Sequence, residues 1–178
     1  MHIYCLYCQT EKCPVTVKVL ERCGYDRVIY PQAITRERVQ GKNVDVCRSL
    51  LPGYLFVYQE EPLSNVTKLK LDANAKRLLG DARTDYELQD TDYDFAMNLL
   101  QKGGVLNTIR VIRVGDRVMI DDPVFAACEG EITKVDNRKQ RARVDFKLSG
   151  MDCHVWVGFE MVKAEEKREA DQENKEEG

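Results

Sequence analysis

The sequence predicts an α+β protein in two parts, an antiparallel sheet flanked by helices and then a small β-barrel. In the first part, apolar strand-like runs alternate with segments that have helical spacing. After Gly103 and Gly104 every segment is a short β-type run. Five such runs within about 50 residues can bury their faces only by curling into a barrel. The expected boundaries are 1–103 for the first domain, 104–110 for a linker and 111–164 for the barrel.

The first domain begins with an aromatic and apolar run, residues 2–8, which is typical of a buried strand. A helix is expected next, because Pro14 suits its first turn and Gly24 suits its C-terminal end. Residues 25–30 resume strand character. The polar segment 32–49 contains a glycine turn signal, which fits a hairpin or an exposed loop.

Residues 49–58 are the most apolar short run and predict a central strand, entered through a bend at Pro52. The segment 63–79 is expected to be helical at least at its start, and 90–100 has the spacing of another short helix. Alternation along the central strand places Tyr54 and Phe56 on the same side as Pro52. If helices cover only the other side of the sheet, this aromatic face stays open and indicates a partner; the alternative is a completed core.

A basic stripe follows the barrel segment 141–148, where apolar and charged residues alternate cleanly. The apolar residues fill the barrel, whereas the cations point outward. Side chains two apart on a strand lie roughly 6.6–6.8 Å from each other, close to the spacing of successive phosphates. The stripe is therefore a candidate RNA surface whose affinity falls as salt rises, with a solvated barrel face as the alternative. Its members are Arg138, Lys139, Arg141, Arg143 and Lys147.

Two further barrel residues have structural expectations. Trp156 lies on a strand and is expected in the core or at the barrel rim, in preference to a base-stacking role. Gly130 is expected to serve a tight bend of the backbone.

Composition excludes several classes. The net charge is −3, so a nucleic-acid role must depend on a local patch. The apolar runs fall far short of the roughly 20 residues of a membrane span, and the chain does not open as a signal peptide does. We expect a cytoplasmic protein with no membrane partner. Residues 165–178 carry three basic and seven acidic side chains with little apolar content, so a disordered acidic tail is expected.

The seven cysteines are expected to be reduced thiols. Cys5, Cys8 and Cys13 superficially resemble a zinc site. However, a strand would send Cys5 and Cys8 to opposite faces, and no second pair completes four ligands. We expect no metal and no cofactor, while a cysteine-based metal or redox module remains the alternative.

The sequence predicts no catalytic set. The two histidines are His2 and His154, and no phosphate-binding loop or serine nucleophile motif is present. Cys153 and His154 are adjacent, but neighbours on a strand point to opposite faces. A protein that is not an enzyme is expected.

Two stretches have a recognisable pattern. Residues 51–57 read Leu-Pro-Gly-Tyr-Leu-Phe-Val, and residues 114–136 begin Val-Gly-Asp-Arg-Val. The first looks like the Pro-Gly-Tyr strand of the N-terminal (NGN) domain of the NusG family of transcription elongation factors, and the second resembles the KOW motif of that family's C-terminal SH3-like barrel. With residues 79–81, the resemblance extends to about Lys163. It implies an NGN domain followed by a KOW barrel.

The resemblance implies that the N-terminal domain binds the clamp helices of RNA polymerase. Residues 135–144 and 156–160 look most like LoaP, a specialised branch of the family. That branch implies processive antitermination and a leader RNA hairpin bound by the barrel. We expect a monomer. The chain departs from the family at 71–74 and 121–123, so no contact to the polymerase gate loop is carried over. The polymerase-binding residues implied are Tyr7, Leu51, Pro52, Tyr54 and Phe56.

Two other readings stay open. In the general branch of the family, the barrel recruits ribosomal protein S10 or the termination factor Rho. A ribosomal-type KOW protein would bind RNA without any polymerase.

Overall fold

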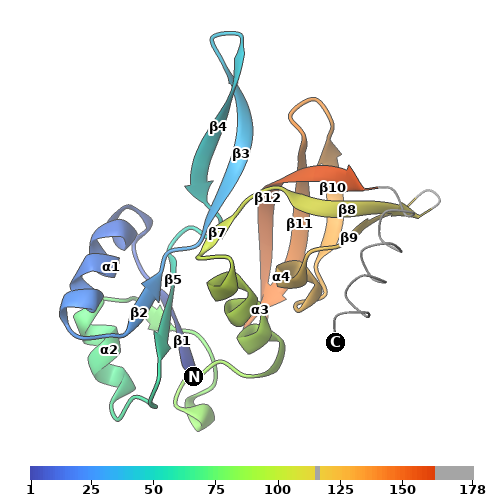
Figure 1. Ribbon diagram of the computed structural model, residues 1–178. Coiled ribbons are helices and arrows are strands. Elements are labelled where there is room, and N and C mark those ends of the chain that lie inside the picture. The colour runs from blue at the N-terminus through green and yellow to red at the C-terminus, as the bar shows by residue number, and fades with distance from the viewer. Residues whose placement is uncertain (115–116, 163–178) are drawn as a thin grey trace, which may run out of the picture.

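The computed structural model describes residues 1–114 and 117–162 (Figure 1). The expected tail, 165–178, lies outside the described residues. The described chain forms an α+β domain, a long hairpin and a small β-barrel, in agreement with the fold class that the sequence predicts. No helix in the described part is long and apolar enough to cross a membrane.

A four-stranded antiparallel sheet forms the centre of the first domain, in the order β2-β5-β1-β6. The two central strands are β1 (His2–Tyr7) and β5 (Tyr54–Gln59), which confirms the predicted central strand. The strands outside them are β2 (Arg27–Ile29) and β6 (Arg77–Leu78). Most β1 and β5 side chains are buried on both faces of the sheet, so each face needs a cover.

Helices α1 (Cys13–Arg22) and α2 (Val66–Asp72) cover one face of this sheet. A short 3-10 turn, η1 (Thr10–Lys12), leads into α1, and Pro14 lies in its first turn as expected. Asn65 caps α2 by accepting a hydrogen bond from the Lys68 backbone N–H, so the helix begins later than residue 63. The apolar residues packed in this layer include Leu6, Leu20, Leu55, Val57 and Leu69.

Helix α3 (Asp90–Gln101) covers the opposite face, where it lies between the sheet and the barrel (Figure 1). A second 3-10 turn, η2 (Ala82–Thr84), precedes it. Buried Phe95, Ala96 and Leu99 give α3 an apolar side, as a helix with this spacing requires. Helices therefore cover both faces of the sheet, so the condition for an open aromatic face is not met.

Strands β3 (Gln32–Val39) and β4 (Lys42–Ser49) form a long antiparallel hairpin that projects beyond the sheet (Figure 1). Of the two structures expected for the polar segment 32–49, a hairpin or an exposed loop, the hairpin is the one observed. A two-residue strand, β7 (Val105–Leu106), pairs with the base of β3 in parallel. Part of the expected linker, 104–110, is therefore paired to the first domain.

The barrel contains five strands in the order β10-β11-β12-β8-β9, and β12 pairs with β8 in parallel. Its first strand begins at Ile109, two residues before the expected boundary. The alternation predicted for 141–148 is confirmed, since Ala142, Val144, Phe146 and Leu148 are buried. The elements are β8 (Ile109–Val114), β9 (Arg117–Ile120), α4 (Pro123–Ala126), β10 (Glu131–Asp136), β11 (Arg141–Leu148) and β12 (Met151–Val162).

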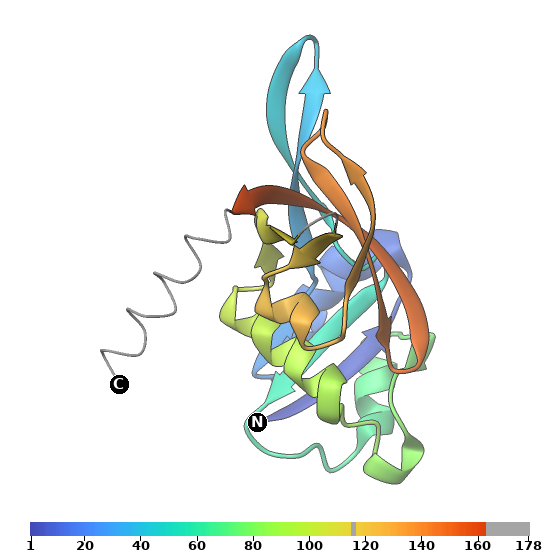
Figure 2. The same ribbon diagram turned by 90° about the vertical axis from the view of Figure 1, so that its right-hand side faces the viewer.

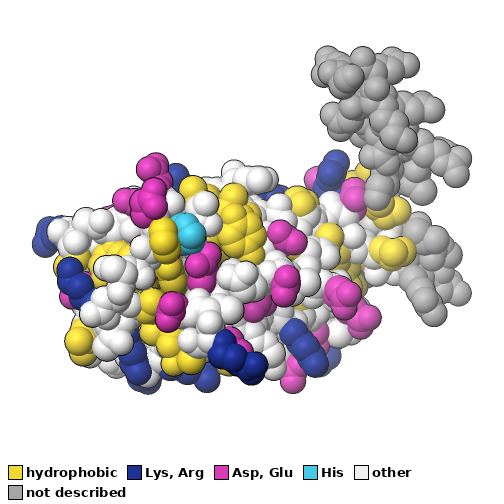
Figure 3. Space-filling view, turned by 90° about the horizontal axis from the view of Figure 1, so that it is seen from below, with side chains coloured by type: hydrophobic (Ala, Val, Ile, Leu, Met, Phe, Trp, Pro, Cys, Tyr) yellow, Lys and Arg dark blue, Asp and Glu magenta, His cyan; other side chains and the backbone are white. Residues whose placement is uncertain are grey.

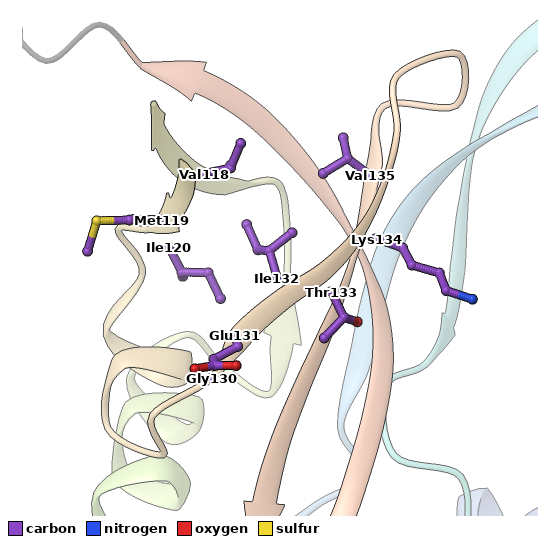
Figure 4. Close-up of a pocket in the computed structure, with 9 residues that line it drawn as sticks. All are labelled: Val118, Met119, Ile120, Gly130, Glu131, Ile132, Thr133, Lys134 and Val135. Atoms are coloured by element: carbon purple, nitrogen blue, oxygen red, sulfur yellow. The ribbon is translucent and has the colours of Figure 1, made fainter. Parts of the chain in front are cut away.

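The barrel is open along a seam between its edge strands β9 and β10 (Figure 4). Ile120 and Ile132 point across the seam, whereas Met119 and Lys134 point away from it. Gly130 lies at the start of β10, where an added Cβ would be 3.0 Å from the Phe125 Cβ. The structure therefore explains this glycine by close packing against α4.

Candidate functional site

Tyr7 and Tyr54 form an aromatic pair at the edge of the sheet face that α3 and the barrel cover. Their ring centroids are 5.0 Å apart and both side chains are partly exposed. The Arg77 guanidinium lies 5.1 Å from the centre of the Tyr7 ring, a cation–π distance. Gly53 has a φ of +90°, and a Cβ there would lie 2.7 Å from the Tyr7 ring, so the bend before β5 needs glycine.

The five residues predicted to bind polymerase do not form one open surface. Tyr7 and Tyr54 are partly exposed and Pro52 is exposed, whereas Leu51 is 3% and Phe56 is 0% exposed. The Phe56 ring packs 6.0 Å from the Phe95 ring. For Leu51 and Phe56 the expected open face is wrong, because α3 and the barrel together cover them.

The barrel strand β11 and the turn after it make the cover. Phe146 of β11 stacks on Phe95 of α3 with ring centroids 5.3 Å apart. In the following turn, the backbone N–H and the hydroxyl of Ser149 both donate to the Asp92 carboxylate, at 2.9 and 2.8 Å. At the start of β12, the Met151 sulfur accepts a hydrogen bond from the Arg77 guanidinium. We call this contact region the clasp.

A second group of contacts joins α3 to α4, which lie side by side in Figure 2. The Lys102 ammonium lies 2.6 Å from the Asp122 carboxylate, which is only 5% exposed. Asp122 also accepts from the Val124 N–H and caps α4. The Asn98 amide donates to the Pro123 carbonyl at 3.1 Å. The two domains are therefore docked through a continuous apolar core with polar contacts around it.

The basic stripe divides into paired and unpaired cations. Arg143 makes a bidentate contact with Asp145, at 2.8 and 3.2 Å, and Arg141 lies 3.4 Å from Asp136. The Arg143 guanidinium holds the pKa of the Asp145 carboxyl below its usual range. Arg138 and Lys139 are exposed at the turn and Lys147 is exposed on β11; none has an ion-pair partner within 1–114 and 117–162.

Trp156 lies on the outer face of the barrel among these cations, a position for which no binding role is expected from the sequence. Its side chain is 37% exposed, and it is directly opposite Arg143 in the β11–β12 register. The Arg141 guanidinium lies over the indole, 4.6 Å from the ring centre. Strand alternation contained the signal, because Val155 and Val157 face inward and Trp156 must then face outward.

The cysteines lie in two separate cores. Cys5 faces the core shared with the barrel, whereas Cys8 and Cys13 face the core under α1 and α2. This confirms the prediction that the strand directs Cys5 and Cys8 to opposite faces. Burial raises the pKa of the Cys8 thiol to about 11, which disfavours the thiolate that a metal needs. Among the described residues, no group of three or more metal-ligating side chains comes together.

Acidic, basic and hydrophobic side chains are interspersed on the lower end of the molecule (Figure 3). The tip of the β10–β11 hairpin, which carries Arg138 and Lys139, is at the upper end in Figure 1. Arg138 and Lys139 of the candidate RNA surface are thus at the hairpin end of the barrel, whereas Lys147 is at the other end of β11.

The fold is that of NusG, an α+β NGN domain followed by a β-barrel. A solved structure of Thermotoga maritima NusG, described as showing a domain interaction, matches with a TM-score of 0.51 and 15% identity. The match covers 88% of this chain and 93% of that one.

In sequence, the chain is similar to the transcription termination/antitermination proteins NusG of Rickettsia felis and Rickettsia conorii. Each is 22% identical over 140 residues, which is 78% of this chain and 73% of the relative. No protein-family model matches the sequence. The chain is thus similar to NusG proteins both in sequence and in fold.

Proposed function

We propose that this chain is a NusG-type transcription factor that binds RNA polymerase through its first domain and RNA through its barrel. The observation that carries the proposal is the aromatic pair Tyr7 and Tyr54 beside the clasp, on the sheet face that the family resemblance assigns to the polymerase clamp helices. Such a protein acts by binding and has no catalytic step. Its effect is on termination or antitermination of transcription.

Polymerase binding at this face requires the barrel to leave it. The Tyr54 hydroxyl donates to the Met151 sulfur, while Phe146 and Ser149 contact α3, so the barrel occupies the side of this face that a clamp helix would need. A polymerase that binds only the undocked form shifts the population toward it, at the cost of breaking the clasp. Once bound, the first domain would favour the closed clamp and disfavour the states that lead to pausing and termination.

The barrel would choose the transcript. Arg138, Lys139 and Lys147 are exposed cations without ion-pair partners in the described structure, so they are free to contact phosphates. The Nε and one Nη of Arg143 already donate to Asp145, so only its remaining N–H groups would be available to a phosphate. We propose, as for the LoaP branch, that the target is a structured leader RNA and that the outcome is readthrough of terminators.

Co-purification with RNA polymerase of the source organism tests the proposed binding of polymerase by the first domain. Tyr54→Ala should reduce polymerase retention at least several-fold while the melting temperature changes little, because Tyr54 is partly exposed. Tyr30→Ala is the matched control, since Tyr30 is also partly exposed but packs in the other core. Equal retention of both variants and the wild-type protein would contradict polymerase binding at this face.

RNA binding measured at a series of salt concentrations tests the proposed binding of RNA by the barrel. The full chain should bind a structured leader RNA. The double variant Arg138→Ala with Lys139→Ala should lower the slope of log K against log salt by roughly 0.7 to 0.9 for each phosphate that the protein no longer neutralises. Lys18→Ala with Lys68→Ala is the control, because both lysines are exposed on α1 and α2. No binding at low salt, with S10 or Rho bound instead, would favour the general NusG reading.

A further inference from the structure

We propose that Trp156 and Arg141 form a nucleobase-binding site on the outer face of the barrel, which takes one unpaired nucleotide of the RNA. This inference rests on the proposed RNA-binding function and specifies the class of ligand. It assigns a stacking role to an indole that the sequence places in the core or at the rim.

The position of Trp156 is unusual for a residue that only packs. Its strand neighbours Val155 and Val157 are 3% and 0% exposed, while the indole is 37% exposed. An indole is among the largest apolar surfaces available to a protein, and leaving it open forgoes burial that would stabilise the fold. An open indole is also the best π-face for a base or a cation.

The indole already holds a planar cation. The Arg141 guanidinium lies 4.6 Å from the ring centre, which is the position a stacked base would occupy. The Arg141 Nε is buried and has no hydrogen-bond partner among the described residues, and its nearest carboxylate oxygen, on Asp136, is 3.4 Å away. Arg141 is thus held by stacking more than by hydrogen bonds. It can slide to sandwich a base against the indole, or yield its place to the base.

Cations lie beside this platform, on the neighbouring strands β11 and β10. The register places Lys134, Arg143 and Trp156 in one row across β10, β11 and β12. Arg138 and Lys139 continue the positive charge into the hairpin turn. A base on the indole would therefore have a flanking phosphate within reach of the cations on β11 and β10, because neighbouring strands are roughly 4.8 Å apart.

This combination favours an unpaired nucleotide over other ligands. A base inside a duplex is stacked on both faces and cannot reach the indole, whereas a loop or bulge base can be splayed out. An acidic protein partner would use the cations but not the ring. The site therefore predicts recognition of a hairpin loop or bulge in preference to a fully paired stem.

Intrinsic fluorescence tests the proposal on the full chain, because Trp156 is the only tryptophan. Titration with a hairpin RNA that has an unpaired loop should quench the emission. A fully paired duplex of matched composition should bind more weakly and quench little. RNA binding is followed in parallel by the anisotropy of a dye on the RNA, so that binding and stacking are measured separately.

Substitution of Trp156 measures how much the indole contributes to RNA affinity. Trp156→Leu should weaken hairpin binding roughly 5- to 150-fold, the range for removal of one base–aromatic stack, with the salt slope unchanged. Trp156→Phe should keep most of the affinity. Thermal melting by circular dichroism checks that both variants fold, and only folded variants are compared.

The outcomes separate the two proposals. Tight hairpin binding without quenching, equal binding of the duplex, or unchanged affinity of folded Trp156→Leu would overturn the base-binding site and leave RNA binding intact. Absence of any RNA binding at low salt would overturn the proposed RNA function itself.

Discussion

Phe95 of α3 stacks on Phe146 of barrel strand β11, with ring centroids 5.3 Å apart and planes 26° apart. The two residues belong to different domains, and Phe125 also meets Phe146 edge-on at 5.6 Å. The aromatic contact therefore joins the sheet face, α3 and the barrel in one core. Any partner that needs this sheet face competes with the molecule's own barrel.

Removal of the Asp92 carboxylate should loosen the clasp. Asp92→Ala deletes the acceptor of both Ser149 hydrogen bonds and should cost the docked state about 1.5–3 kcal/mol, since hydrogen bonds to charged groups fall in this range. We expect faster deuterium uptake in β5 and α3 and tighter polymerase binding. Asp94→Ala, an exposed neighbour on the same helix, is the control. Unchanged exchange in Asp92→Ala would show that the clasp does not hold the domains together.

Ser149→Ala should have a smaller effect than Asp92→Ala. The backbone N–H of residue 149 can still donate to Asp92, so only the hydroxyl hydrogen bond is removed. The same deuterium-exchange experiment measures the difference. A larger effect for Ser149→Ala would contradict the geometry of the clasp.

Phe56→Ala should destabilise the protein by about 3–5 kcal/mol, the cost of removing a large buried aromatic side chain. Urea unfolding gives this value, and Tyr54→Ala should lose much less. A combined Tyr54→Ala and Phe56→Ala variant is therefore not a clean test of partner binding, because the loss of Phe56 also destabilises the fold. If the aromatic face were open, the double variant would keep its fold and could serve as that test. Equal losses of stability for the two single variants would be inconsistent with the burial of Phe56.

Thiol reactivity should divide the cysteines by exposure. Cys23 and Cys47 are exposed and should be alkylated first at pH 8, whereas the other five are buried. Cys8 should react slowly, because burial raises its pKa to about 11 and little thiolate is present. Mass spectrometry of an iodoacetamide time course measures the order. If the purified protein instead contained one zinc ion per chain, and the Cys8→Ser variant contained none, the alternative of a cysteine-based metal module would be favoured.

Acid should weaken the barrel face through Asp145. Its pKa is lowered, first by the Arg143 hydrogen bond, so its contribution to stability is complete above the unfolded pKa. That contribution disappears as the pH falls through the lower folded value, below the ordinary 3.8. Urea midpoints measured between pH 6 and the acid range should fall further in the wild-type protein than in Asp145→Asn. If the urea midpoints of the two proteins changed in parallel with pH, the Arg143–Asp145 pair would contribute nothing to stability.

Local patterns in the sequence were sufficient for the central strand, the alternation of β11 and the opposite orientations of Cys5 and Cys8. Each depends on a period of two along one strand, which the residues themselves determine. The cover over Phe56 could not be predicted in this way. It depends on Phe146 and Ser149, which lie about ninety residues further along the chain, and periodicity carries no information on such long-range packing.

For Trp156, the sequence pattern determines the direction of the side chain but not its neighbours. Its outward direction follows from the buried Val155 and Val157 on either side, so the alternation rule alone places it on the surface. Its position opposite Arg143 and under Arg141 depends on the register of β11 with β12, which only the structure supplies.

Photo-crosslinking from position 54 tests the central claim most directly. A benzophenone amino acid in place of Tyr54 should crosslink to the largest subunit of RNA polymerase when the full chain is bound to the enzyme. The same probe in place of Tyr30 should give no such product. If the probe at position 54 crosslinks only to the chain's own β11–β12 turn, even with polymerase in excess and bound, the assignment of this sheet face to polymerase is contradicted.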